Sequence, residues 1–199
     1  MDQPLGFMVG NALEVREALD CLRGGGPQDL RSVTLSLATE AVLAAEGGTG
    51  EDAAVERLEE LLGSGAGLER FARLVERQGG DPRIVEDDSL LPTAPVRVDW
   101  VAPVDGYVAR IDAYEIGLAS VELGAGRVRT EDEVDPAVGI ELCAKVADPV
   151  ARGMPLAVVH ARTQEDAAAA AARIARAFEL SEGPVGEPPA LVWKRVTKA

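Results

Sequence analysis

Few residues of this 199-residue chain are of the types that carry chemistry, and one group of them has a suggestive spacing. Gly6 and Gly10 flank a short turn near the N-terminus, and Glu17 lies on a helix expected to begin near Asn11. A glycine-flanked turn can point backbone carbonyls inward, and carbonyls with one carboxylate suit a hard, weakly charged cation. The residues alone favour the simpler interpretation that Glu17 is a solvated helix residue.

The other candidate groups give weaker signals. The single histidine, His160, falls at the end of a predicted strand, where a half-exposed structural residue is a simpler interpretation than a catalytic base. Residues 124–127 (Gly-Ala-Gly-Arg) could offer N–H groups and a guanidinium to an anion, but a turn that ends a helix is the simpler interpretation. The acidic residues 86–88 are interpreted as a solvated loop rather than a metal site. The sequence contains no recognisable serine–histidine nucleophile motif or Walker loop.

The composition excludes several classes of protein. Twenty Lys and Arg against 34 Asp and Glu give a net charge of −14, which argues against binding to nucleic acid or to an anionic membrane. A hydrophobic fraction of 47% excludes a disordered acidic chain. No apolar run approaches the ~18 residues of a membrane helix, and residues 1–10 lack the basic start of a signal peptide. Two distant cysteines, Cys21 and Cys143, predict reduced thiols in a cytoplasmic protein.

Helical periodicity dominates the first eighty residues. Apolar stripes predict four helices, and the glycine runs 24–26, 47–48 and 79–80 end three of them. Pro27 suits the first turn of the second helix, and Thr49 with Asp52 resembles a capping box for the third.

The periodicity changes after residue 95. Alternation and apolar runs predict strands at 96–101, 107–111, 138–142, 156–160 and 191–193. A short helix is predicted at 116–123, and an alanine-rich helix begins after Thr163 and carries Phe178 on its inner face. The chain is therefore predicted to be α/β (α+β), with a helical segment at 1–80, a proline-rich acidic linker at 81–95 and a strand-rich domain at 96–199.

Several blocks of sequence, in order along nearly the whole chain, resemble the pyrimidine-nucleoside and thymidine phosphorylases. The blocks are MDQPLG (1–6), GNALEV (10–15), LRGGGPQDL (22–30), QGGDP (78–82), DGYV (105–108), EIG (115–117), LGAGR (123–127), DPAVGI (135–140) and GMPLA (153–157). Independent blocks in register are far more specific than any single motif. Ala147 departs from the pattern, because family members have glycine there.

The resemblance implies the C-terminal half of such a phosphorylase: the helical part of its α/β domain, then a C-terminal α+β domain. It implies a pentosyltransferase of nucleoside salvage, in which phosphate attacks C1′ of a pyrimidine nucleoside to give a free base and a pentose 1-phosphate. It also implies a cytoplasmic homodimer without an organic cofactor. Whether the enzyme prefers thymidine or accepts pyrimidine nucleosides broadly stays open.

The same resemblance assigns one partial site. The carbonyls of Leu5 and Met8 and the carboxylate of Glu17 match three ligands of a monovalent cation, usually potassium. Family members are longer, and the residues that bind phosphate and base lie before the position that matches Met1. The chain is therefore expected to contain no catalytic or phosphate-binding residue and to be an inactive fragment that needs a missing N-terminal segment. A stand-alone, non-catalytic binding or interaction module is the alternative.

Overall fold

The computed structural model describes residues 3–46, 50–186, 188 and 190–196. The chain divides into two compact units, neither of which is contiguous in sequence. The strand-rich unit comprises residues 1–15 and 91–189, and the helical unit comprises residues 16–90 and 190–199. The first fifteen residues therefore group with the strands, whereas the sequence alone assigned them to the helical segment. Each unit is described separately below.

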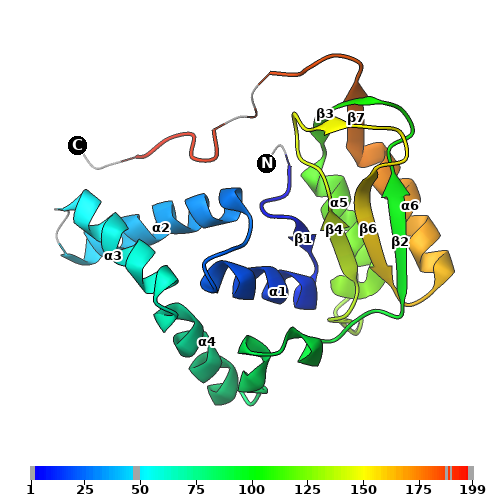
Figure 1. The fold of residues 1–199 in the computed structure, drawn as a ribbon. Coiled ribbons are helices and arrows are strands. Elements are labelled where there is room, and N and C mark those ends of the chain that lie inside the picture. Colours follow the sequence, from blue (N-terminus) through cyan, green and yellow to red (C-terminus); the bar gives the residue numbers. More distant parts are fainter. Residues whose placement is uncertain (1–2, 47–49, 187, 189, 197–199) are drawn as a thin grey trace. The chain divides into compact units, whose positions relative to one another are not determined.

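Four helices form the first part of the chain, as the apolar periodicity predicted (Figure 1). They are α1 (Asn11–Leu22), α2 (Gln28–Glu46), α3 (Glu51–Gly63) and α4 (Ala66–Arg77). Within the helical unit, α3 packs against α2 and α4. The predicted helix end at Gly47-Gly48 and the predicted cap at Thr49 lie outside the described residues, and Gly50 stands at the N-cap of α3.

The predicted linker is partly ordered as two short 3₁₀ helices, η1 (Pro82–Val85) and η2 (Asp88–Leu90). The Asp81 carboxylate accepts a hydrogen bond from the N–H of Arg83 and so caps η1. Part of the acidic cluster also has a structural role, because Asp88 pairs with Arg23 after the end of α1. The prediction of a purely solvated loop was therefore wrong for Asp88.

Seven strands in the strand-rich unit form two antiparallel sheets, ordered β1-β4-β6-β2 and β5-β3-β7. Their bounds are β1 Met8–Val9, β2 Val96–Val101, β3 Gly106–Ile111, β4 Gly139–Leu142, β5 Pro149–Val150, β6 Pro155–Ala161 and β7 Phe178–Ser181. Four of these strands were predicted from the sequence, and the structure confirms an α+β fold.

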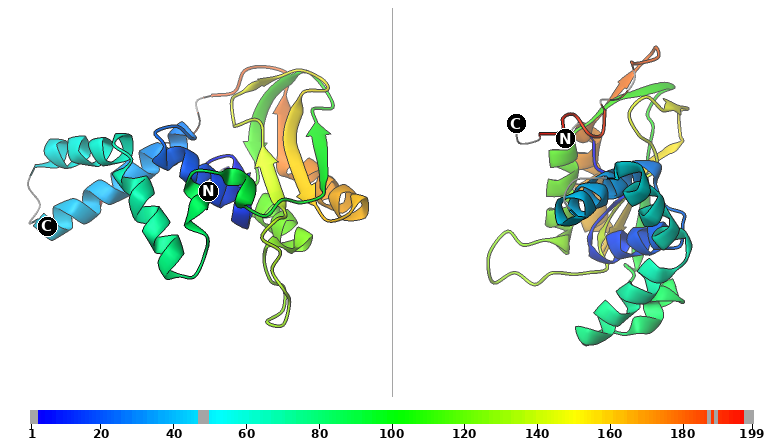
Figure 2. Two further views of the ribbon diagram at one scale, coloured as in Figure 1. Left: turned by 60° about the horizontal axis from the view of Figure 1, so that its bottom comes forward. Right: turned by 90° about the vertical axis from the view of Figure 1, so that its left-hand side faces the viewer.

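Two helices complete the core of this unit. Helix α5 (Ala113–Ser120) continues into a π-helical turn, Val121–Ala125, and α6 (Gln164–Ala177) packs against α5, β2 and β6. Trp100 of β2 lies with its ring centroid 5.0 Å from that of Phe178. The N-terminus of α6 forms as predicted, with the Thr163 hydroxyl accepting a hydrogen bond from the Asp166 N–H at 3.1 Å. Figure 2 shows the connection from this π-helical turn to β4 projecting beyond the sheet as a long loop.

Three short strands were missed, and one predicted strand does not form. Strands β1 and β5 contain two residues each, too few to show an alternating pattern. Helix α6 ends at Ala177, and Phe178 has an extended backbone that begins β7 instead of completing the inner face of the helix. Residues 191–193 form no strand, and Trp193 there is 96% exposed. Among the described residues, no helix is long and apolar enough to cross a membrane.

Candidate functional site

The N-terminal turn has the geometry that its two glycines suggested. Gly6 has a φ of 66° and Gly10 a φ of 137°, values that side-chain-bearing residues rarely adopt. At Gly10, a Cβ would lie 2.7 Å from the carbonyl oxygen of Val138, closer than atoms can approach. The two glycines therefore fix the path of residues 3–10 into β1 and onward into α1.

The carbonyl of Met8 faces away from the sheet. The N–H of Leu142 donates to the Phe7 carbonyl at 2.7 Å, and Met8 lies opposite Glu141 in the next position of the ladder. Hydrogen-bonded and non-hydrogen-bonded pairs alternate along antiparallel strands, so Met8 directs its carbonyl away from β4. Because β1 is the edge strand of its sheet, no neighbouring strand among the described residues uses this carbonyl.

The carbonyl of Leu5 lies between two carbonyls that are already occupied. The Lys145 ammonium donates to the carbonyl of Pro4 at 2.7 Å and to that of Gly6. Among the described residues, the Leu5 carbonyl accepts no hydrogen bond. Like Met8, Leu5 therefore presents a backbone oxygen that the local fold does not use.

Glu17 is buried, with 6% of its surface exposed, so the expectation of a solvated helix residue was wrong. It lies in the helical unit, whereas Leu5 and Met8 belong to the strand-rich unit. Burying a carboxylate is costly unless a cation or hydrogen-bond donors compensate for lost hydration. No group of three or more His, Cys, Asp or Glu in the described part of the chain could hold a metal.

His160 is also buried, at 7% exposure, and not half-exposed as predicted. Strand β6 is an interior strand that continues to Ala161, so His160 has neighbours on both sides, opposite Arg97 and Gly139. Its Nε2 lies 3.4 Å from Oε2 of Glu141, and that same oxygen lies 3.3 Å from Nη2 of Arg97. His160 thus takes part in cross-strand pairing within the sheet.

Residues 124–127 form a turn that ends a helix, which is the simpler of the two interpretations of that sequence. Gly124 has a φ of 105°, and its carbonyl accepts a hydrogen bond from the Asp135 N–H at 2.8 Å. The Ala125 carbonyl accepts another, from the Asn11 side chain at 2.8 Å. The turn therefore offers carbonyls to its neighbours and is held by them as part of the fold.

The surroundings of both cysteines disfavour the thiolate form. They form no disulfide in the described structure, and each is partly buried. Burial raises the pKa of the Cys21 thiol and the Cys143 thiol, with nearby carboxylates adding to the effect. Since the thiolate is the reactive form, a raised pKa disfavours reaction at either side chain.

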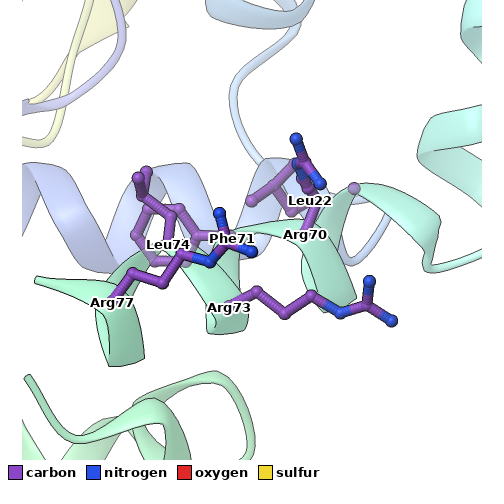
Figure 3. Close-up of a pocket in the computed structure, with 7 residues that line it drawn as sticks. Leu22, Arg70, Phe71, Arg73, Leu74 and Arg77 are labelled. Carbon is purple, nitrogen blue, oxygen red and sulfur yellow. The ribbon is translucent and has the colours of Figure 1, made fainter.

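A pocket of about 340 Å³ in the helical unit was not predicted from the sequence (Figure 3). Its apolar lining comes from Leu22, Phe71 and Leu74, and its charged lining consists of arginines of α4. These are Arg70, Arg73 and Arg77. Arg73 pairs with Glu69, one helical turn earlier. Guanidinium groups around an apolar floor suit an anionic group with an apolar body.

Comparison with known proteins identifies the family. Residues 107–181 match the model of the pyrimidine nucleoside phosphorylase C-terminal domain. The pyrimidine-nucleoside phosphorylase of Bacillus subtilis (strain 168) is 47% identical over 164 residues, which cover 82% of this chain and 38% of the relative. The corresponding proteins of Staphylococcus haemolyticus and Staphylococcus aureus (strain USA300) are 43% and 41% identical over 164 and 165 residues.

The chain spans about 38% of the length of these curated relatives and matches their C-terminal region. The match covers both the helical segment and the strand-rich domain, because 164 aligned residues extend well beyond the domain model. Over its matched length, this chain belongs to the pyrimidine-nucleoside phosphorylase family and carries the C-terminal domain of that family.

Proposed function

We propose that this chain supplies the C-terminal part of a pyrimidine-nucleoside phosphorylase. The reaction would convert phosphate and a pyrimidine nucleoside into a free base and a pentose 1-phosphate, without an organic cofactor. The observation that carries the proposal is the 47% identity to the Bacillus subtilis protein over 82% of this chain. The domain match at residues 107–181 supports it independently.

The contribution of this chain would be structural and ionic. The Leu5 and Met8 carbonyls and the Glu17 carboxylate would hold a potassium ion, which supplies positive charge close to the bound phosphate. The outward-facing backbone carbonyl of Met8, on the edge strand of its sheet, favours this assignment. The groups that contact phosphate and base would come from the part that the relatives carry outside the match, and two complete subunits would form a homodimer.

Complementation tests the proposal directly. Base release from thymidine and uridine is measured with inorganic phosphate for the chain alone, then for the chain mixed with the unmatched N-terminal part of the Bacillus subtilis relative. We expect no turnover from either polypeptide alone and turnover from the mixture. Turnover by the chain alone in the usual range of about 1–10³ s⁻¹ would contradict this division of roles. An inactive mixture would favour a stand-alone, non-catalytic module.

The cation is tested by exchanging potassium for choline at equal ionic strength. The mixture is expected to lose activity in choline, and the chain alone is expected to melt at the same temperature in both salts. Three ligands from one polypeptide replace too little of the hydration shell of the ion to stabilise the isolated chain. A potassium-specific rise in melting temperature of the chain alone would show that the site is complete within it.

A further inference from the structure

The ammonium of Lys145 joins two segments that are far apart in the sequence. Its partners are the carbonyls of Pro4, 141 positions away, and Gly6, 139 positions away. The same ammonium lies 5.0 Å from the ring centroid of Phe7. Both carbonyl-bearing residues are buried, and a buried carbonyl without a donor is costly. Lys145 therefore satisfies backbone carbonyls of the N-terminal segment at its two buried residues.

Two neighbours of Lys145 hold the same segment. The N–H of Leu142 donates to the Phe7 carbonyl at 2.7 Å, and the N–H of Val146 donates to the Gln3 side-chain oxygen at 2.9 Å. The end of β4 and the turn after it thus bind residues 3–7 at successive points. Lys145 provides the charged contact among them, and hydrogen bonds to charged groups are stronger than neutral ones.

From these contacts we infer that Lys145 is a positioning residue: it holds residues 3–7 against the β4–β5 connection and thereby sets the Leu5 and Met8 carbonyls. Leu5 lies between the two carbonyls that the ammonium binds, and Met8 follows the ring that the ammonium covers. An ammonium has three donors and can bind both carbonyls at once, whereas the thioether of methionine has no donor. The consequence for the cation rests on the proposed function, whereas the positioning itself does not.

The first test uses amide exchange of the full chain, followed by NMR. In Lys145→Met, the amides of Leu142 and Val146 should exchange about tenfold faster or more, because their acceptors lie on the released segment. The amide of Cys143 lies between them but donates to Leu156 at 2.9 Å, so it should not change. Lys194→Met, at an exposed lysine, is the matched control. Unchanged exchange at Leu142 and Val146 would overturn the inference.

A second measurement, on the unmodified chain, tests whether the Lys145 ammonium is held in place even if Lys145→Met does not fold. A limiting amount of an amine-acylating reagent is added, and the modified lysines are quantified by mass spectrometry. Lys145, whose nitrogen is held by two carbonyls, should react about tenfold more slowly than the exposed Lys194. Equal rates would show that the ammonium is not held, and the inference would be wrong.

The third test concerns the cation and uses the complemented mixture. With Lys145→Met, the potassium concentration that gives half the maximal rate should rise about tenfold, while the rate at saturating potassium should be nearly retained. Lys145→Arg, which keeps a charged donor, should restore part of the affinity. An equal loss of rate at every potassium concentration would mean that Lys145 only stabilises the fold. An inactive mixture would refute the proposed function, and the exchange result would still decide the role of Lys145.

Discussion

Arg23 and Asp88 form a two-point ion pair, with Nη1···Oδ2 at 3.1 Å and Nη2···Oδ1 at 2.5 Å. Arg23 follows the last residue of α1, and Asp88 begins η2. The guanidinium also donates to the Val85 carbonyl at 3.0 Å. The hydrogen bond from Arg23 lowers the pKa of Asp88, because it favours the ionised carboxylate. Within the helical unit, Arg23 therefore joins the predicted linker, at Val85 and Asp88, to the end of α1.

Asp88→Asn should lower the free energy of unfolding of the helical unit by about 1 kcal/mol at neutral pH, the upper range for a partly exposed pair. A carboxyl group whose pKa is lowered by folding stabilises the folded state above its unfolded pKa of about 3.9. This contribution disappears as the pH falls through the lowered pKa. Urea unfolding followed by circular dichroism should therefore show a difference at neutral pH that vanishes in acid. Glu86→Gln, an exposed neighbour, is the control, and an equal loss at both pH values would contradict the prediction.

Ala147→Gly should stabilise the strand-rich unit. Ala147 has a φ of 78°, and it is the one residue other than glycine with a positive φ among those described. The left-handed conformation costs roughly 1–2 kcal/mol for a residue with a Cβ, and the greater freedom of glycine in the unfolded chain offsets part of the gain. A net gain of about 0.5–1 kcal/mol in urea unfolding is expected. Ala151→Gly, in a nearby turn without positive φ, should be destabilising, and a gain there would undermine the explanation.

Thr39→Val should stabilise the helical unit slightly. Thr39 is 4% exposed, and its hydroxyl has no hydrogen-bond partner among the described residues. A buried hydroxyl without a partner is unfavourable, and valine has nearly the same shape. Thermal unfolding should show a gain of about 0.5–1 kcal/mol. Thr34→Val, at an exposed position of the same helix, should change stability by less than about 0.5 kcal/mol. A loss at position 39 would show that the hydroxyl is in use.

Hydrogen exchange should be uneven between the two units. Of the ten largest side chains that are fully buried in the described structure, nine belong to the strand-rich unit and Leu19 is the exception. In the helical unit, by contrast, Leu37 is 67% exposed and Leu61 and Leu74 are also exposed. Few buried apolar contacts predict low local stability. Amides of α2–α4 should therefore exchange much faster than those of β3, β4 and β6, and equal protection in a monomer would contradict this.

Local patterns predicted most of the helices and strands, because periodicity and capping act over a few residues. Thr163 illustrates this, since its hydroxyl and the Asp166 N–H are only three positions apart. The two-residue strands were beyond such patterns, because their pairing partners lie far along the chain. The strand predicted at residues 191–193 was wrong for the same reason. A short apolar run does not show whether a neighbouring strand is present to pair with it.

In the candidate site, too, local features could be predicted from the sequence and long-range contacts could not. The sequence placed Glu17 on a helix and gave the glycines of the turn, but it predicted neither the burial of Glu17 nor that of His160. Burial depends on neighbours from other elements, such as the flanking strands of β6. No sequence signal pointed to Lys145, because its partners lie 139 and 141 positions away.

Each unit contains a segment that is distant in sequence from the rest of it: β1 in the strand-rich unit and the residues around Arg195 in the helical unit. This arrangement affects folding during translation. Strand β1 pairs with β4, and Arg195 near the C-terminus pairs with Glu40 and Glu51 of the helical unit. Because the ribosome releases the N-terminus first, β1 must wait for β4 to be synthesised before it can pair. Throughout that interval the nascent segment 3–10 has an unpaired edge, which exposes it to chaperones and proteases.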